Sequence, residues 1–421
     1  MVQEVDGHTV PMTFGNDGYA LEALENGVAL VDQSHWGRLR VAGPDRLTFL
    51  HGQSTADITS LTPGKGTWSV FTTPQARCVD LVTMYVQKEG VMIVTSPGLS
   101  AQLAERLNKY IFPADKVQVL DISPRTSMFV VLGPKAESLM AEIKADTALG
   151  AAEHSHIVMG FQGKPVIIAR GGDICDGVRL TGYTLIADES VAGELWSVLC
   201  NKGAVPMGTR GWEIARVMAG RPMPGSELTD DFTPLDAGLY DAISLSKGCY
   251  VGQETLSKVY LRQAMRWELW GLDLQAPVQV GASVSFDKGQ EDKNEQTPRT
   301  QGMVTSYVDT VQMKCRALAY LRRPRTNDTK NTTALQSGLE VFIDGTVRGR
   351  AVPLPFIRRN FREGQGPELP QGASTTTTEA EDDDEATRKA EKLAALQAQL
   401  AAWQASQGQQ QQQGSGGGGE E

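Results

Sequence analysis

Apolar residues recur along this chain at two periods, which together predict helices interleaved with strands. Alternating polar and apolar positions at 38–41 predict a strand, and a Gly-Pro-Asp turn then opens a short helical run that ends at His51. The apolar runs at 78–86 and 91–95 flank turn residues and predict a hairpin. A further run at helical spacing predicts a core-facing helix: Leu99, Leu103, Leu107 and Ile111.

Residues 115–220 repeat this mixture of periods. Strand-like runs lie at 116–120, 127–132, 165–169 and 180–186. Helix-like runs lie at 134–145, 189–202 and 210–219. Elements in this order pack as helices on antiparallel sheets, so the pattern predicts an α+β fold and disfavours a doubly wound one.

From Trp267 the helical period disappears and short strands follow one another. They lie at 267–274, 278–286, 302–309, 314–322 and 339–350, with a charged insert at 287–300. Such a series predicts a small closing β-barrel or sandwich. The whole pattern therefore predicts three domains and a tail, with the boundaries 1–114, 115–264, 265–362 and 363–421.

The tail 363–421 contains threonine, glutamine and glycine runs, and its composition predicts disorder. Within it, Ala386–Ala405 carries an apolar stripe that fits either a transient helix or a partner-binding segment. The tail also holds 11 acids against 3 bases, a net of -8 within the total of -10, which leaves about -2 for residues 1–362. A body so close to neutral gives no indication of nucleic-acid binding through a basic surface.

Cysteine spacing limits the chemistry further. The five cysteines contain no C-x-x-C pair, so they indicate reduced thiols and predict neither a disulfide framework nor a self-contained metal site: Cys78, Cys175, Cys200, Cys249 and Cys315. No apolar run approaches the roughly 20 residues that a bilayer span needs, so no membrane segment is predicted. The start, Met1 to Asp17, carries three acids and no arginine, which is not typical of a signal or transit peptide.

One stretch, 247–254, concentrates the candidate chemistry. It reads Lys-Gly-Cys-Tyr-Val-Gly-Gln-Glu and lies where an expected strand at 243–245 gives way to an expected helix at 254–263. A nearby ammonium and a helix N-terminus both favour a thiolate, so Cys249 is a candidate nucleophile or metal ligand. The alternative is a small buried apolar residue, which is the commoner role of a single cysteine. Spacing alone leaves both open.

Upstream, Glu213 and Arg216 share one helix face at i,i+3, which usually makes a surface pair of little energetic weight. Together with 247–254, however, this region resembles the YgfZ family of folate-binding proteins. Three runs carry the resemblance: Arg216-Val217-x-x-Gly220-x-Pro222-x-x-Gly225-x-Glu227-Leu228, Pro234-Leu235-Asp236-Ala237-Gly238-Leu239, and Lys247-Gly248-Cys249-Tyr250-x-Gly252-Gln253-Glu254.

That family is related to the T-protein, the aminomethyltransferase of the glycine cleavage system. The resemblance covers about 26–361, and Gln253-Glu254-Thr255 with Leu269-Trp270-Gly271 is most similar to its cyanobacterial and plastid branch. It implies two α+β domains, the first of them folate-binding, and a β-barrel around a channel for tetrahydrofolate. It also implies a chloroplast location, with mitochondrial or cytoplasmic alternatives.

The resemblance further implies a role in assembly or repair of [4Fe–4S] clusters, including those of enzymes that modify tRNA. The implied partners are iron–sulfur cluster assembly proteins and [4Fe–4S] client enzymes, with no direct nucleic-acid or membrane contact. Cys249 would be the functional thiol and Lys247 its charged neighbour. The implied folate-binding candidates are Asp80, Arg77, Arg216, Tyr250, Gln253 and Glu254.

Two limits apply to these implied roles. A strand-end aspartate such as Asp80 is also an ordinary turn or cap residue. One thiolate cannot hold an iron–sulfur cluster alone, because clusters take about four ligands. Cys249 would therefore share a transient iron–sulfur cluster with a partner, or act as a thiol beside bound folate.

Departures from the T-protein pattern leave two other hypotheses. The T-protein holds its pterin with an acidic segment, whereas the matching place here, Leu180–Leu185, has no acid, and the T-protein lacks the Lys-Gly-Cys motif. Folate-dependent aminomethyl transfer is therefore the second hypothesis. A non-catalytic adaptor, with Cys249 as a packing residue, is the third.

Overall fold

The structure is a computed structural model, and it describes residues 1–5, 7–171, 182–262, 264–286, 300–309, 314–323 and 335–354. The chain divides into two units, Met1–Leu369 and Pro370–Glu421, and every described residue belongs to the first. The predicted tail 363–421, its candidate helix at 386–405 and nearly all of the insert at 287–300 therefore lie outside the described residues.

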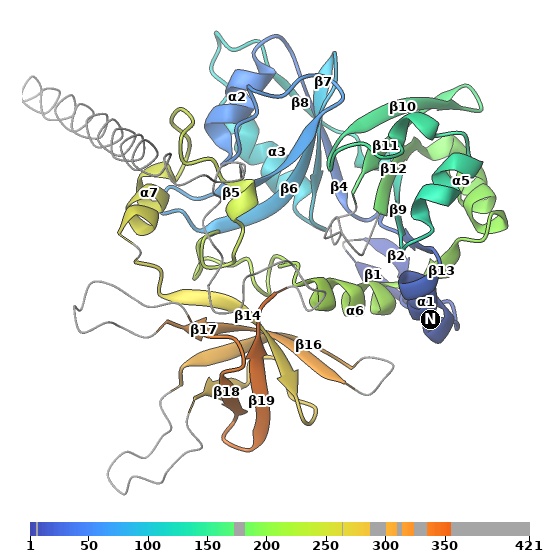
Figure 1. Cartoon of the computed structure of the whole chain (residues 1–421). Coiled ribbons are helices and arrows are strands. Elements are labelled where there is room, and N and C mark those ends of the chain that lie inside the picture. Colours follow the sequence, from blue (N-terminus) through green and yellow to red (C-terminus); the bar gives the residue numbers. More distant parts are fainter. Residues whose placement is uncertain are drawn as a thin grey trace, which may run out of the picture. The chain divides into compact units, whose positions relative to one another are not determined.

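The first large sheet is antiparallel, with the strand order β5-β6-β7-β4-β8 (Figure 1). Its strands are β4 (Gly37–Ala42), β5 (Gly66–Thr72), β6 (Cys78–Val86), β7 (Gly90–Thr95) and β8 (Gln118–Asp121). Helices α2 (Arg46–Gln53) and α3 (Ser100–Lys109) share an apolar core with one face of this sheet. The predicted hairpin and the predicted helix with its apolar stripe are both confirmed, as β6–β7 and α3.

The second sheet has six strands in the order β10-β11-β12-β9-β3-β13. They are β3 (Ala29–Asp32), β9 (Thr126–Leu132), β10 (His156–Phe161), β11 (Lys164–Arg170), β12 (Gly182–Asp188) and β13 (Val205–Met207). Helices α4 (Ala136–Glu142) and α5 (Glu189–Asn201) pack on its outer face. Helices α1 (Asp17–Asn26) and α6 (Thr209–Ala219) lie beside β13, and β1 (Val2–Val5) pairs with β2 (His8–Pro11) as a separate ribbon.

The inner faces of the two large sheets share one apolar core. Tyr85 and Met92 of the first sheet pack in the same cluster as Met128 and Ile167 of the second. The order of layers is therefore α2 and α3, first sheet, second sheet, α4 and α5. This arrangement is the predicted combination of sheets with packed helices, but the second sheet is mixed, because β13 pairs with β3 in parallel. The sequence also did not predict that the two sheets share a core.

Arg38 holds in place the segment of the chain that runs from β3 of the second sheet to β4 of the first. Its side chain is fully buried on β4, and its five N–H donors go to backbone and hydroxyl oxygens on either side of it. The acceptors are the carbonyls of Ser34, Trp36, Ser123 and Thr126 and the hydroxyl of Thr126. Burial lowers the pKa of Arg38 to about 10, and the complete set of acceptors offsets the cost of placing this cation in the interior.

Two strands lie in a different sheet from their sequence neighbours. β3 precedes the first sheet in the chain but pairs with β9 of the second, while β8, which follows residue 114, pairs with β4 of the first. The predicted domain boundaries stay a prediction, but these pairings show that the sheets interlock around residue 114.

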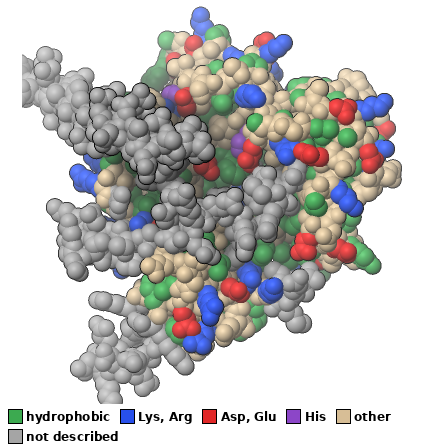
Figure 2. Space-filling model, in the orientation of Figure 1, with side chains coloured by type: hydrophobic (Ala, Val, Ile, Leu, Met, Phe, Trp, Pro, Cys, Tyr) green, Lys and Arg blue, Asp and Glu red, His purple; other side chains and the backbone are tan. Residues whose placement is uncertain are grey.

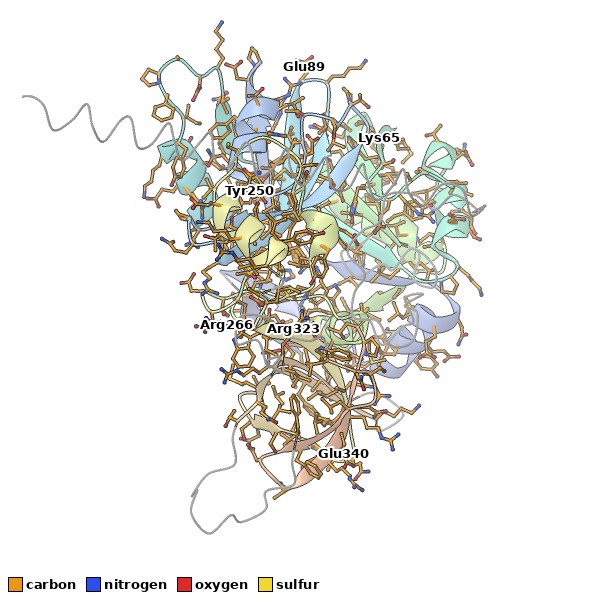
Figure 3. The ribbon with its side chains drawn as sticks, turned by 60° about the vertical axis from the view of Figure 1, so that its left-hand side comes forward. Lys65, Glu89, Tyr250, Arg266, Arg323 and Glu340 are labelled. Carbon is orange, nitrogen blue, oxygen red and sulfur yellow. The ribbon has the colours of Figure 1, made fainter. Side chains whose placement is uncertain are left out.

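The closing domain is a closed barrel with the strand order β14-β17-β16-β15-β18-β19. Its strands are β14 (Trp267–Leu274), β15 (Ser283–Ser285), β16 (Gly302–Asp309), β17 (Cys315–Arg322), β18 (Glu340–Ile343) and β19 (Val347–Val352). Of the two predicted architectures the barrel is therefore correct. Figure 3 shows Arg266 and Arg323 at one end of the barrel and Glu340 toward the other.

Two strand predictions in the barrel were wrong in extent. The single strand expected at 339–350 is a hairpin, because Asp344 and Gly345 adopt positive φ angles of 46° and 68° and turn the chain back. The strand expected at 278–286 is reduced to the three residues of β15.

Candidate functional site

Residues 247–252 form an irregular loop that follows a 3₁₀ turn, η3 (Tyr240–Ala242), and Gln253 and Glu254 begin helix α7 (Gln253–Leu261). The strand predicted at 243–245 was wrong. That segment is not part of any sheet; instead the Ser244 amide donates to the carbonyl of Thr55, and the Thr55 hydroxyl donates to the carbonyl of Ala242. The predicted helix is confirmed as α7, although it begins at Gln253 and its expected end at 263 lies outside the described residues.

Lys247 docks this loop on the C-terminal end of helix α2. Its ammonium donates to the carbonyl oxygens of His51, Ser54 and Ala56 at 2.5, 2.6 and 2.7 Å. These carbonyls belong to the end of a helix and the turn beyond it, where a cation also complements the helix dipole. Burial lowers the pKa of Lys247 to about 7, and the charge of Asp57 opposes this effect.

Gly252 and Gln253 fix the shape of the loop. Gly252 has a φ of +86°, and a Cβ there would lie 2.7 Å from both the Thr72 hydroxyl and the Thr73 carbonyl, so only glycine fits without displacement. The side-chain Nε2 of Gln253 donates to the Lys247 carbonyl at 3.2 Å, and its Oε1 accepts from the backbone N–H of Tyr250 at 3.3 Å. The motif residues therefore hold the loop around the cysteine.

Cys249 itself is exposed and makes no disulfide. The alternative of a buried packing cysteine is therefore wrong for the free chain. The predicted activation by Lys247 is not evident in the contacts, because the three ammonium donors go to carbonyls of residues 51–56. Cys249 also precedes the N-terminal cap of α7, Gly252, by three residues. The loop thus presents a thiol to solvent on a firmly held backbone.

A histidine–aspartate pair lies beside the loop. His51 Nδ1 is 3.2 Å from Asp57 Oδ1, and a Cβ built on Gly248 would lie 3.6 Å from His51 Nε2. Burial, followed by the charge of Lys247, lowers the pKa of His51, and Asp57 opposes both. Sequence reasoning missed this pair, because nothing in the spacing of His51 and Asp57 connects them to residue 248.

Tyr250 and Glu254 occupy opposite environments. Tyr250, labelled in Figure 3, is buried. Its ring centroid lies 4.7 Å from the Lys247 ammonium, and its hydroxyl has no hydrogen-bond partner among the described residues. Burial raises the pKa of this hydroxyl. Glu254 instead makes an exposed i,i+4 ion pair with Lys258 on α7, which contributes little to stability.

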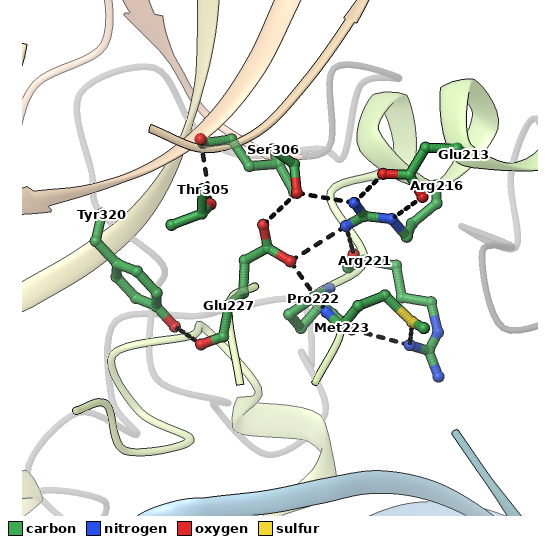
Figure 4. A network of polar contacts seen from close by, with 10 residues as sticks. Glu213, Arg216, Arg221, Pro222, Met223, Glu227, Thr305, Ser306 and Tyr320 are labelled. Atoms are coloured by element: carbon green, nitrogen blue, oxygen red, sulfur yellow. Dashed lines mark hydrogen bonds and ion pairs between the residues drawn. The ribbon is translucent and has the colours of Figure 1, made fainter. Parts of the chain in front are cut away.

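Arg216 lies in a buried network that joins helix α6 to the barrel (Figure 4). Its five N–H donors are all used: two go to Glu213, one to the Arg221 carbonyl, one to Glu227 and one to the Ser306 hydroxyl. Ser306, on β16, donates in turn to Glu227 at 2.6 Å. The expected pair with Glu213, whose side chain is 43% exposed, is therefore the outer part of a network whose members Arg216, Glu227 and Ser306 are buried.

The charges in this network stabilise one another. Arg216 and Glu227 are 2% and 0% exposed. Burial alone would lower the pKa of Arg216, but its hydrogen bond to Glu213 and the charge of Glu227 raise it. Sequence reasoning quoted Glu227 within a motif without giving it a role, and Ser306 is 90 residues away from Arg216, so no local pattern connects them.

Asp80 and Arg77 lie on β6 and in the turn before it. Asp80 is fully buried and accepts hydrogen bonds from the amide and hydroxyl of Ser96 at 2.9 and 2.7 Å. Arg77 is half-buried and donates to the Asp231 carbonyl at 2.6 Å. Burial raises the pKa of the nearby carboxyl of Asp236. Hydrogen bonds from Thr233 and the charge of Arg77 oppose this shift.

The predicted site residues therefore fall into separate groups. Lys247, Cys249, Tyr250 and Gln253 form one loop, whereas Arg216 belongs to the junction of α6 with the barrel. Among the described residues, no three His, Cys, Asp or Glu side chains gather closely enough to hold a metal ion. No described helix has the length and apolarity of a membrane span.

One buried group has an unused hydrogen-bonding capacity that the sequence did not reveal. Gln33 follows β3 and is 1% exposed, yet within the described part of the chain neither the nitrogen nor the oxygen of its side-chain amide has a hydrogen-bond partner. A buried amide without partners costs free energy. It is therefore a candidate contact for a polar ligand.

The fold and the match to a family model define the class of protein. Residues 2–247 match the model described as the GCVT N-terminal domain. A solved structure, the glycine cleavage system aminomethyltransferase T of Bartonella henselae, superposes with a TM-score of 0.71 at 20% identity, covering 85% of this chain and 94% of that one. The chain belongs to the GCVT domain family, and it has the T-protein fold.

Two relatives with assigned names are similar to this chain in sequence. One is a chloroplastic protein of Arabidopsis thaliana, and its name assigns it provisionally to the transferases. The two sequences are 40% identical over 275 residues, and the matched part covers 65% of this chain and 63% of that protein. The aminomethyltransferase of Rubrobacter xylanophilus is 26% identical over 86% of this chain and 91% of its own length.

Proposed function

We propose that this chain is a tetrahydrofolate-binding member of the YgfZ branch of its family and supports assembly or repair of [4Fe–4S] clusters, with Cys249 as the functional thiol. The observation that carries this proposal is the exposed thiol on a loop whose neighbouring residues serve to hold it. Lys247, Gln253 and Gly252 all fix the backbone around Cys249, which is typical of a positioned functional group.

The cluster is the cargo in this proposal. A single thiolate supplies one of about four ligands, so a partner protein would supply the others during a transfer. Cys249 is accessible to such a partner because its side chain is exposed. Three carbonyls and a tight glycine turn anchor its loop, so we expect the loop to stay in place when a partner binds.

The donor groups of the interior fit a folate in part. Gln33 offers an unpartnered donor and acceptor side by side, which complements the edge of a pterin ring. Arg77 is half-buried and suits the glutamate tail, since only one described hydrogen bond engages its guanidinium. Arg216 does not fit this role, because all five of its donors already have partners. Bound tetrahydrofolate would supply a carrier for one-carbon units.

Calorimetry with tetrahydrofolate tests the folate part of the proposal. Gln33→Leu keeps the size of the side chain and removes its polar atoms, so we expect binding to weaken at least tenfold. Gln118→Leu, the same change at an exposed position of an edge strand, is the matched control and leaves affinity unchanged. Absence of binding by the folded wild-type chain would overturn the folate assignment.

Complementation tests the thiol. In cells depleted of this protein, we expect the wild-type chain and Cys200→Ser to restore the activity of a [4Fe–4S] enzyme, and Cys249→Ser to fail. Cys200 is a suitable control because it is a partly exposed free thiol on α5, away from the loop. Full rescue by Cys249→Ser would favour the adaptor hypothesis.

Aminomethyl transfer is a second candidate, favoured by the relationship to aminomethyltransferases over most of the chain. The sequence argument against aminomethyl transfer is that the segment 180–185 has no acid. Only 182–185 of that segment, at the start of β12, are among the described residues. The assay is formation of methylene-tetrahydrofolate from an aminomethyl-loaded lipoyl carrier protein. Turnover that survives Cys249→Ser would support this function over cluster work.

A chloroplast location is part of the proposal and is supported by the name of the Arabidopsis relative. Imaging of the full-length gene product, fused at its C-terminus to a fluorescent protein, tests it. Fluorescence confined to mitochondria or cytosol would contradict it.

A further inference from the structure

The core shared by the two large sheets is incomplete at one end. A cavity of about 650 Å³ lies there, between the β6–β7 turn of the first sheet and strands β10, β11 and β12 of the second. Figure 3 marks this turn of the first sheet by Glu89. The volume is within the range of cavities that hold small organic molecules.

The wall of the cavity is mainly apolar. Side chains from both sheets and from the segment before β5 line it: Pro63, Met92, Val158, Pro165, Ile167 and Ile186. Met92, Ile167 and Ile186 are also members of the inter-sheet core, at 5%, 8% and 3% exposure. An apolar ligand there would complete the same core and gain the free energy of removing its surface from water.

One polar side chain in this wall has an unsatisfied atom. His156 lines the cavity and is 8% exposed, and its Nδ1 is buried without a hydrogen-bond partner in the part of the chain that the structure describes. Its backbone amide donates to the Gly64 carbonyl and its ring meets the edge of Tyr85 at 5.4 Å, so the imidazole is held in place. A positioned and unpaired nitrogen is what a ligand hydroxyl or ring N–H requires.

Charges at the rim restrict the ligand further. Lys88 and Glu89 carry opposite charges, and Asp188 is paired with the ammonium of Lys164 at 3.5 Å. Such a rim offers a polyanion, including the glutamate tail of a folate, no excess of positive charge. Burial also lowers the pKa of His156, and a backbone hydrogen bond with His154 opposes this shift. Figure 2 shows acidic and basic side chains intermingled on the face of the molecule that is in view.

We infer that this cavity is a second ligand site, for a small, uncharged and largely apolar molecule that presents one hydroxyl or ring N–H to His156. The site shares no residue with the 247–254 stretch or with the Arg216 network. It therefore stands independently of the proposed cluster and folate chemistry.

The test uses two probes of equal size on the full-length chain. 2-Naphthol carries a hydroxyl that can donate or accept, and 2-methylnaphthalene replaces it with a methyl group. We expect both to bind by fluorescence titration, with 2-naphthol about tenfold tighter because it hydrogen-bonds to His156. His156→Phe is expected to abolish that preference while leaving 2-methylnaphthalene binding unchanged.

A second variant tests the location without altering the core. Val158 lies two residues from His156 on the same face of β10 and is 59% exposed, so Val158→Trp should obstruct the cavity and weaken both probes at least tenfold. Val280→Trp, at a 63% exposed valine of the barrel, is the matched control and should change neither. The inference is overturned if neither probe binds, if Val158→Trp has no effect, or if a folded His156→Phe keeps the preference for 2-naphthol.

Discussion

Arg216 Nη1 and Glu227 Oε2 form a 3.2 Å ion pair in the interior, at the point where helix α6 meets the barrel. Ser306 of the barrel strand β16 donates to the same carboxylate and accepts from the same guanidinium. The pair therefore couples the packing of the barrel to that of the two sheets, and removing one partner would leave the other charge buried and uncompensated.

The first prediction concerns this pair. Arg216→Ala should lower the free energy of unfolding by about 3–5 kcal/mol, because Glu227 would be left as an unpaired buried carboxylate. The double variant Arg216→Met with Glu227→Leu should cost less than the single change. Urea denaturation measures both. Lys258→Ala, which breaks an exposed ion pair on α7, is the control and should cost less than about 1 kcal/mol; an Arg216→Ala effect of that small size would contradict the prediction.

The second prediction concerns the pH dependence of the Lys247 contact. Because burial lowers the pKa of Lys247 to about 7, the folded chain binds fewer protons at this group than the unfolded chain between about pH 7 and pH 10.4. The unfolding free energy of the wild type should therefore rise with pH across this window relative to Lys247→Met. Its contribution is least favourable below pH 7, where both states are protonated.

Urea denaturation of both proteins at pH 7, 8.5 and 10 measures this difference, and comparing the two removes the contributions of other groups. At pH 7, Lys247→Met should also destabilise the C-terminal end of helix α2, because the carbonyls of His51, Ser54 and Ala56 lose the ammonium that donates to them. A difference between the two proteins that stays constant from pH 7 to 10 would contradict the lowered pKa.

Local patterns predicted the elements that depend on local spacing. The stripe that includes Leu103 and Leu107 predicted α3, since both residues are buried on one face of that helix. The Asp344-Gly345 dipeptide was also a usable turn signal, and reading it would have divided the strand predicted at 339–350. This error came from overlooking a local rule.

Other features depend on contacts between distant residues and leave no local signal. β3 pairs with β9 nearly a hundred residues later in the chain, and no periodicity within β3 indicates that partner. In the candidate site, the motif directed attention to the loop that carries Cys249, and the role of Cys249 stays a prediction. It did not indicate that Lys247 binds residues 51–56, because a sequence neighbour of Cys249 is not necessarily its spatial neighbour.

The third prediction separates the two glycines of the loop. Gly252→Ala should destabilise the protein by at least about 1 kcal/mol, because it combines a positive φ with a Cβ that meets the Thr72 hydroxyl and the Thr73 carbonyl at 2.7 Å. Gly248→Ala is the control, since its Cβ would meet nothing closer than His51 Nε2 at 3.6 Å. Thermal unfolding compares them, and equal melting temperatures for the two variants would refute the role given to Gly252.

The fourth prediction concerns thiol accessibility. In a Cys175→Ser background, which removes the cysteine outside the described residues, native protein should react with a thiol reagent in one fast phase from Cys249. Cys200 should react more slowly, since it is partly covered and burial raises its pKa. Cys78 should stay unreactive until unfolding, because it is buried and burial raises its pKa strongly.

Stopped-flow absorbance with an aromatic disulfide reagent at pH 8 resolves these phases. Adding Cys249→Ser should remove the fast phase alone, and adding Cys200→Ser should remove the slow one. The same assay with Gly252→Ala tests whether the anchored loop determines the fast rate, because a displaced loop would change that rate while leaving the slow phase unaltered. Persistence of the fast phase in Cys249→Ser would mean that another thiol is the most accessible one, and the cluster proposal would then lose the observation that carries it.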